Sequence, residues 1–187
     1  MPRRRLWIGL AVLVAVQAAA IGLYKLKRGG HVESAPFSSE TIAPRDAPAL
    51  AFERADGQRG TLVGVRGKFV MVHFWATWCE PCRDELPGLL IRARELAASG
   101  RFELLAVAID DDWDAIGRFF GGTVPRSIVR PETTDIHRRF GASTLPDTYL
   151  VDTNGKLVIR YAGARDWTDP RARAHLSRAI EMDERRK

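Results

Sequence analysis

The sequence predicts an α/β domain with a mixed central sheet flanked by helices, and three features lead to this fold class. Phe69–Trp75 is a run of β-branched and aromatic residues, which is typical of a strand covered on both faces. A segment with apolar residues at helical spacing follows it, and Phe102–Ile109 is then predicted to be a second buried strand. Asn154-Gly155 is a hairpin signal between Thr148–Asp152 and Leu157–Tyr161. This final hairpin would run antiparallel to the earlier strands and make the sheet mixed.

Residues 1–28 are predicted to be a single-pass membrane anchor. Leu6–Tyr24 contains one strongly polar residue, Gln17, and is close to the length of about 20 apolar residues that a span requires. Six of the 29 Lys and Arg residues lie within the first 30 residues, which contain no acid, and the other 23 balance 23 acidic residues. The basic charge therefore flanks the apolar segment, which indicates membrane topology and not a nucleic-acid-binding surface.

A signal peptide cleaved after Ala18-Ala19-Ala20 is the alternative interpretation, which would leave a soluble periplasmic protein. Apolar character continues through Ile21 and Leu23, which favours the uncleaved anchor in the inner (cytoplasmic) membrane. In either case we expect the domain to face the periplasm or cell exterior, where disulfides form. Residues 29–48 are rich in Gly, Ser and Pro and are predicted to be a flexible tether, which leaves 49–187 as the folded domain.

The remaining elements are predicted from local signals along the domain. Ala49–Glu53 and Arg59–Val63 flank an Asp-Gly turn and are expected to pair as an N-terminal hairpin. A long helix begins at Cys79, with Pro87 inside it, and ends at Gly100.

Further along, Asp112 is predicted to cap a helix, whereas Asp110 and Asp111 are interpreted as solvated loop residues. An inserted segment is expected near Gly121–Thr134 and a short helix over Thr134–Phe140. The last helix begins at Pro170, after a capping Thr168 or Asp169.

Cys79 and Cys82, the only two cysteines, lie where a predicted strand ends and a helix begins. Unpaired N–H groups and the helix dipole stabilise a thiolate there, so the spacing favours a dithiol in which one cysteine attacks a disulfide and the other resolves it. A zinc site would need two further ligands, and the four histidines are scattered singly. A structural disulfide across four residues would restrain little of the unfolded chain. Redox chemistry is therefore the favoured interpretation.

Phe74–Cys82, Phe-Trp-Ala-Thr-Trp-Cys-Glu-Pro-Cys, resembles the active site of the TlpA/ResA-like membrane-anchored thiol:disulfide oxidoreductases. Gly67-Lys68, Pro87 and Thr144–Asp152 fit the same pattern, and the resemblance spans about Ala47 to Tyr161. It implies a thioredoxin fold in which Cys79 is the exposed nucleophile and Cys82 the resolving cysteine. It adds no cofactor or metal, because the Cys79–Cys82 disulfide would itself be the redox group.

The resemblance also assigns residues around the cysteines. Pro146 matches a cis-proline that would face the cysteines and leave the Leu145 backbone free for a substrate peptide, and Trp78 would contribute to the apolar collar of that substrate site. Glu85, three residues after Cys82, shares its helix face and matches a glutamate that can take a proton from the resolving thiol. His73 departs from thioredoxins, which carry a buried aspartate there, and we interpret it as a hydrogen-bonded core residue.

We therefore expect an exported oxidoreductase that reduces protein disulfides. The resemblance implies clients such as apocytochrome c or copper-site assembly factors, and re-reduction by a membrane electron donor. A thiol peroxidase of the same fold is one alternative, but it needs Thr or Ser where Ala76 stands. A copper-binding carrier is the other, and the C-x-x-C spacing without a paired histidine argues against it.

Overall fold

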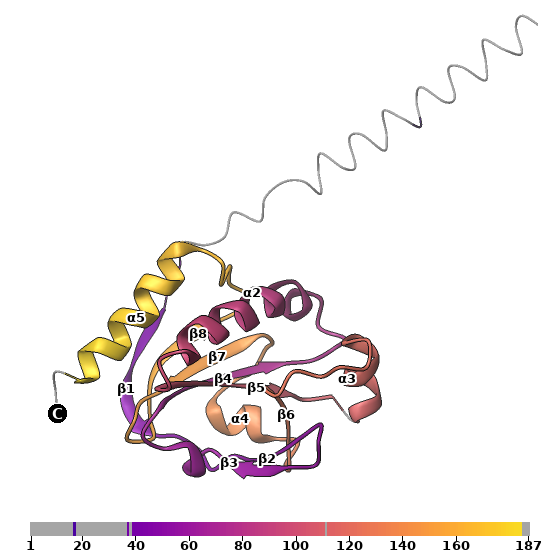
Figure 1. The fold of residues 1–187 in the computed structure, drawn as a ribbon, viewed down its shortest axis with the longest axis horizontal. Coiled ribbons are helices and arrows are strands. Elements are labelled where there is room, and N and C mark those ends of the chain that lie inside the picture. Colours follow the sequence, from indigo (N-terminus) through magenta and orange to yellow (C-terminus); the bar gives the residue numbers. More distant parts are fainter. Residues whose placement is uncertain (1–16, 18–36, 38, 111, 185–187) are drawn as a thin grey trace, which may run out of the picture. The chain divides into compact units, whose positions relative to one another are not determined.

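The residues that the structure describes form an eight-stranded mixed sheet with its flanking helices (Figure 1). The computed structural model describes residues 17, 37, 39–110 and 112–184, and the elements that follow belong to one compact unit, residues 36–187. Across the sheet the strand order is β1-β8-β7-β4-β5-β6-β2-β3. In chain order the elements are β1 (Glu40–Asp46), β2 (Ala51–Arg54), β3 (Arg59–Thr61), the 3-10 turn η1 (Val63–Val65), β4 (Phe69–Trp75), α2 (Glu80–Ala97), β5 (Phe102–Ala108), α3 (Trp113–Phe119), β6 (Ile128–Pro131), α4 (Ile136–Phe140), β7 (Asp147–Val151), β8 (Lys156–Ala162) and α5 (Pro170–Glu184).

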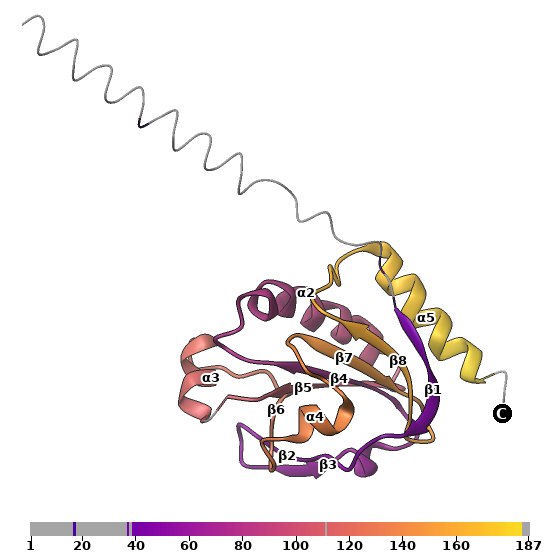
Figure 2. The same ribbon diagram turned by 180° about the vertical axis from the view of Figure 1, so that it is seen from behind.

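The central strand β4 separates two apolar cores. It pairs in parallel with β5 and antiparallel with β7, so all seven of its residues are buried. Successive side chains point to opposite faces: Met71 and Trp75 pack with residues of α2 and α5, whereas Val72 and Phe74 pack with residues of α4. Figures 1 and 2 show α2 and α5 on one face of the sheet and α4 on the other. The carboxyl end of β4 leads directly into the amino end of α2.

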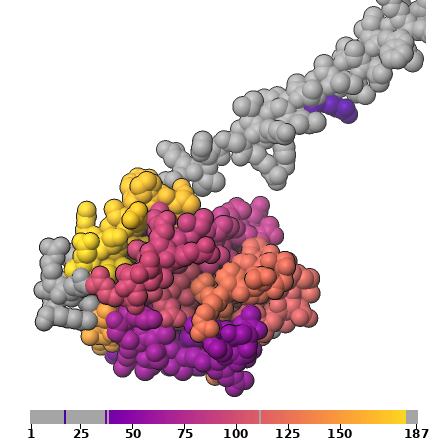
Figure 3. All heavy atoms as spheres, viewed as in Figure 1, coloured from indigo at the N-terminus to yellow at the C-terminus, as the bar shows by residue number. Residues whose placement is uncertain are grey.

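Helices α2 and α5 lie side by side on their face of the sheet, although more than 70 residues separate them in the chain (Figure 3). Arg92 of α2 ties them together, because its Nε donates to the Trp167 carbonyl at 3.1 Å and its Nη2 to the Thr168 carbonyl at 3.2 Å. These two carbonyls lie just before α5 begins. The arrangement fixes the segment that leads into α5 against the active-site helix.

Most predicted elements are confirmed with small changes at their ends. The N-terminal hairpin is β2 and β3, paired antiparallel, and the C-terminal hairpin is β7 and β8. Asp112 caps α3, since its Oδ1 accepts a hydrogen bond from the backbone N–H of Ala115 at 2.8 Å. Pro87 lies inside α2 as predicted.

Two predictions about strands are wrong. The predicted tether, residues 29–48, includes β1, which pairs with β8 at the edge of the sheet. The pairing register shifts between Thr41 and Arg45, where Pro44 lies, and a proline is tolerated at such an irregular edge position. The sequence of β1 therefore lacks the alternation that predicts a regular strand. The predicted insertion near Gly121–Thr134 includes β6, which joins β5 to β2. With only four residues, β6 is too short for a pattern in the sequence, and its pairing partners stabilise it.

The predicted membrane segment, Leu6–Tyr24, lies outside the described residues apart from Gln17. Among the residues that the structure describes, no helix has the length and apolar character needed to span a bilayer.

Candidate active site

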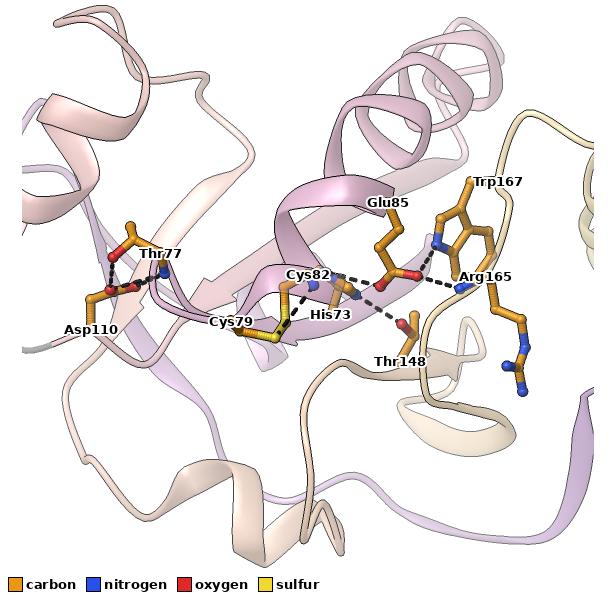
Figure 4. Close-up of a disulfide and its surroundings, with 9 residues drawn as sticks. All are labelled: His73, Thr77, Cys79, Cys82, Glu85, Asp110, Thr148, Arg165 and Trp167. Atoms are coloured by element: carbon orange, nitrogen blue, oxygen red, sulfur yellow. Dashed lines mark hydrogen bonds and ion pairs between the residues drawn. A yellow bond between two sulfur atoms is a disulfide. The ribbon is translucent and has the colours of Figure 1, made fainter. Parts of the chain in front are cut away.

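Cys79 and Cys82 form a disulfide at the junction of β4 and α2 (Figure 4). Cys79 is the N-cap of α2, and its Sγ accepts a hydrogen bond from the Cys82 backbone N–H at 3.3 Å. The Cys79 residue is 7% exposed and Cys82 is 0% exposed. Of the two residues, only Cys79 therefore retains any exposure, and its sulfur lies at the positive end of the helix dipole, where a thiolate is stabilised.

The loop before the disulfide is held by Asp110. Its carboxylate accepts hydrogen bonds from the Thr77 backbone N–H, at 3.0 and 3.1 Å to its two oxygens, and from the Thr77 hydroxyl at 2.5 Å. Asp110 is buried, so its interpretation as a solvated loop residue is wrong. The parallel pairing of β4 with β5 brings the ends of both strands together, and this places Asp110 beside the active-site loop. Trp78, which follows Thr77 and precedes Cys79 in the chain, is 68% exposed.

Glu85 lies in the next turn of α2 and is only 6% exposed. Its Oε2 accepts hydrogen bonds from the Arg165 backbone N–H at 2.5 Å and from Trp167 Nε1 at 3.3 Å. Burial raises the pKa of the Glu85 carboxyl from 4.5 to about 8, and the two hydrogen bonds and the Arg165 charge oppose this rise without cancelling it. At neutral pH the carboxyl is therefore mainly protonated.

His73 faces the same carboxyl from β4. Its Nδ1 lies 2.9 Å from the Thr148 hydroxyl, and its Nε2 lies 3.6 Å from Glu85 Oε1. Burial lowers the pKa of the imidazole from 6.5 to about 3, so the ring is neutral and its contact with Glu85 is not a salt bridge at physiological pH. The prediction of a buried, hydrogen-bonded histidine is confirmed, and the structure adds its proximity to Glu85.

The Leu145–Pro146 peptide bond is cis, as predicted from the resemblance. Pro146 is buried, and its carbonyl accepts a hydrogen bond from the Gly163 backbone N–H at 3.0 Å. Leu145 is half-buried and packs against the core cluster that contains both cysteines. This segment immediately precedes β7, the strand that carries Thr148, the hydroxyl partner of His73.

Three partners of the site had no signal of their own in the sequence. Arg165 and Trp167 follow Glu85 by 80 and 82 residues, and they reach it because Arg92 holds the chain before α5 against α2. Phe37 packs on Trp167 with ring centroids 5.5 Å apart and in a near edge-on arrangement. In the sequence, Trp167 is an isolated tryptophan ahead of a predicted helix, which is equally typical of a core residue and does not point to this site.

A cavity of about 540 Å³ lies elsewhere, between the start of β5 and the end of α2. Its lining includes Arg54, Lys68, Arg94 and Phe102, and it shares no residue with the disulfide site. The cysteines lie where the carboxyl end of β4 meets the amino end of α2, whereas the cavity lies at the carboxyl end of α2, away from the sulfur atoms. The chemistry of the candidate active site therefore rests on the disulfide, the Glu85 carboxyl and the neutral His73 ring.

Comparisons with known proteins agree with this geometry. The AhpC/TSA family model matches residues 44–160. ResA, a thiol-disulfide oxidoreductase of Bacillus subtilis, is 30% identical over 161 residues, which cover 83% of this chain and 84% of ResA. CycY, a thiol:disulfide interchange protein of Rhizobium leguminosarum, is 32% identical over 63% of this chain and 62% of its own.

Among solved structures, a thioredoxin-family thiol:disulfide interchange protein from Chlorobium tepidum is 23% identical, covers 76% of this chain and 98% of its own, and superposes with a TM-score of 0.58. That likeness supports the fold. The extent of the match to ResA, together with a disulfide at the first turn of α2, decides the family. The chain belongs to the AhpC/TSA family of thioredoxin-fold proteins and, within it, to the ResA-like thiol-disulfide oxidoreductases.

Proposed function

We propose that the protein is an exported reductant of protein disulfides. The observation that carries this direction is the complete burial of Cys82, three residues before buried Glu85. Loss of hydration disfavours a thiolate at Cys82, and exposed Glu80 in the first turn of α2 opposes the helix dipole at Cys79. A dithiol without a strongly stabilised thiolate has a low reduction potential, because a very stable thiolate is what makes a strong oxidant.

In the proposed reaction, the Cys79 thiolate attacks a client disulfide, forms a mixed disulfide and releases one client thiol. In molecules whose Glu85 carboxyl is ionised, the minor form at neutral pH, the Cys82 thiol then passes its proton to Glu85 and attacks the Cys79 sulfur. The second client sulfur leaves and takes up that proton as a thiol, and the Cys79–Cys82 disulfide remains. Two electrons pass from the dithiol to the client. Trp78, Leu145 and Pro146 would contact the client around Cys79.

A trapping experiment tests the roles of the two cysteines. With Cys82→Ser, the resolving thiol is gone, so a mixed disulfide through Cys79 should accumulate with a model client. With Cys79→Ser, the remaining sulfur is fully buried, and we expect no such adduct. Non-reducing electrophoresis and mass spectrometry of the adduct distinguish these outcomes, and trapping through Cys82 would reverse the assignment.

The reduction potential tests the direction of electron flow. We expect a value near that of thioredoxin, about −270 mV, when the oxidised and reduced forms are equilibrated with a thiol buffer. A value near that of DsbA, about −120 mV, would make the protein an oxidant and contradict the proposal.

We further propose that the N-terminal segment anchors the protein in the cytoplasmic membrane and that a membrane donor re-reduces it. The apolar run Leu6–Tyr24 with basic flanks supports the anchor. The full-length protein should then stay in the membrane fraction after an alkaline carbonate wash, whereas a soluble form beginning near Ile21 would show that the segment is cleaved.

Apocytochrome c and copper-site assembly factors are the client classes we propose. Reduction of a disulfide in a peptide with two closely spaced cysteines, as in a haem-attachment site, is the corresponding assay. Two measurements separate the alternatives. Anaerobic copper titration of the reduced protein tests a copper carrier, and peroxide consumption tests a thiol peroxidase. Against the peroxidase, the Thr77 hydroxyl is bound to Asp110, and Ala76 has no hydroxyl.

A further inference from the structure

Two buried polar atoms without a hydrogen-bond partner face each other beside the disulfide. They are His73 Nε2 and Glu85 Oε1, which lie 3.6 Å apart (Figure 4). A buried polar atom left unpaired destabilises a fold, and both atoms would be satisfied by one hydrogen bond between them. A movement of roughly 0.7 Å brings them to hydrogen-bond distance.

The other polar atoms of the pair are already bound. Glu85 Oε2 accepts two N–H donors, from Arg165 and Trp167, and His73 Nδ1 is bound to the Thr148 hydroxyl. An N–H group cannot accept a hydrogen bond from a protonated carboxyl oxygen. A proton placed on Oε2 would therefore displace at least one of these two donors. A proton on the carboxyl is therefore best placed on Oε1, where it points at His73.

Few charges face the pair. On Glu85, the segment before α5 contributes the Arg165 cation. From α2 the pair is flanked by the two sulfurs, which do not titrate as a disulfide, and from β5 the register neighbour of His73 is Ala106. β7 contributes the neutral Thr148. Burial keeps the ring uncharged, so His73 carries one N–H throughout.

The geometry points to His73 as a tautomer switch that keeps Glu85 hydrogen-bonded whether its carboxyl is ionised or protonated, a positioning role that rests on Glu85 being the proton acceptor of the proposed function. With Glu85 ionised, the ring carries its proton on Nε2 and donates to Oε1, while the Thr148 hydroxyl donates to Nδ1. With Glu85 protonated on Oε1, the carboxyl donates to Nε2, and the ring proton lies on Nδ1 and is donated to the Thr148 oxygen.

The protons balance between the two states. Cys82 loses one proton and the Glu85 carboxyl gains it, while His73 keeps a single ring proton and Thr148 keeps its hydroxyl hydrogen. Only the hydroxyl can serve as donor in one state and acceptor in the other. The pair thus exchanges a proton with the thiol without creating an imidazolium in the core.

Nitrogen NMR of the oxidised full-length protein in mild detergent tests this directly, because no thiol titrates in the disulfide form. We expect the His73 ring nitrogens to change from the Nδ1–H to the Nε2–H pattern as the pH rises, with the same midpoint as the carboxyl carbon of Glu85. Glu85→Gln should make the ring pattern independent of pH. A single tautomer across the carboxyl titration, or an imidazolium pattern at any pH from 5 to 9, would overturn the proposal.

Thr148→Val provides an isosteric control that removes only the hydroxyl. The substitution removes the partner of Nδ1 in both states, but a buried N–H donor left without an acceptor is the less tolerated of the two defects. The protonated state of Glu85, which needs the acceptor, is therefore disfavoured more, and the carboxyl midpoint should fall by about one pH unit, a tenfold loss of proton affinity. Thr148→Ser retains the hydroxyl and should restore the midpoint, whereas equal midpoints in all three proteins would refute the switch.

The kinetic role of Glu85 is tested separately. If Glu85→Gln leaves the thiol kinetics unchanged, while in the wild type the His73 tautomer follows the Glu85 carboxyl, the proposed role of Glu85 in catalysis fails and the switch stands. If Glu85→Gln slows the thiols while the tautomer does not follow the carboxyl, the switch fails and the role of Glu85 stands.

Discussion

Replacing Glu85 by glutamine should remove the loss of stability that the oxidised protein undergoes as the pH rises from about 6.5 to about 8, and so make it more stable at alkaline pH. The substitution keeps the size and hydrogen-bonding capacity of the side chain and removes one buried titratable group. Burial raises the pKa of the folded carboxyl from 4.5 to about 8. Because the folded value is the higher one, the stability from the protonated form is fully present below about pH 4.5 and is lost as the pH rises through about 8.

The magnitude follows from this interval. Between the two pKa values the folded state holds a proton that the unfolded state has released, so the free energy of unfolding falls by about 1.4 kcal/mol per pH unit. Over the whole interval from 4.5 to about 8, the loss is on the order of 5 kcal/mol. His73 acts in the opposite sense, since its folded pKa of about 3 lies below 6.5 and its contribution rises with pH across that range.

Below pH 6.5 the two slopes largely cancel in the wild type, and the difference between wild type and Glu85→Gln isolates the carboxyl. The assay is guanidinium unfolding of oxidised residues 36–187 at pH 5 to 9. The two proteins should have similar stability near pH 5, and the variant should become progressively more stable above it. Asp84→Asn, which removes an exposed carboxylate from the same helix, controls for the lost charge. Parallel stability curves for wild type and Glu85→Gln would refute a carboxyl that is protonated in the fold.

Substitutions at four other residues test the surroundings of the site. Trp167→Phe removes the N–H donor to Glu85 Oε2 and keeps the ring, so the pKa of Glu85 should rise further, and an unchanged carboxyl titration would contradict that bond. Asp110→Ala removes both acceptor oxygens, so it should destabilise the protein by roughly 1–3 kcal/mol and cost more than Thr77→Val, which removes only the hydroxyl bond; equal losses in denaturant unfolding would mean that the backbone bond contributes nothing. Trp78→Ala should leave unfolding within about 0.5 kcal/mol, because the side chain is exposed, and slow the reduction of a protein disulfide, whereas an unchanged rate would remove Trp78 from the client surface.

The elements with strong local signals could be predicted from the sequence. Phe69–Trp75 had to be a central strand because every residue in it is apolar or aromatic apart from His73, and only a strand covered on both faces buries all of them. The cysteine pair could be placed at a helix start, and redox chemistry inferred, because thiolate stabilisation depends on that local position. The cis bond at Pro146 was available only through the resemblance, since most X–Pro bonds in folded proteins are trans.

Tertiary structure alone decided which groups surround the sulfurs. β1 and β6 are strands because neighbouring strands offer them backbone partners. Their sequences, Glu40–Asp46 and Ile128–Pro131, have no pattern that predicts a strand. The sequence pattern indicates a solvated Asp110, yet the parallel pairing of β4 and β5 buries it against Thr77. The setting of Glu85 likewise depends on segments 80 residues away. A pKa responds to burial and to every donor within a few ångströms, and those distances exist only after the chain has folded.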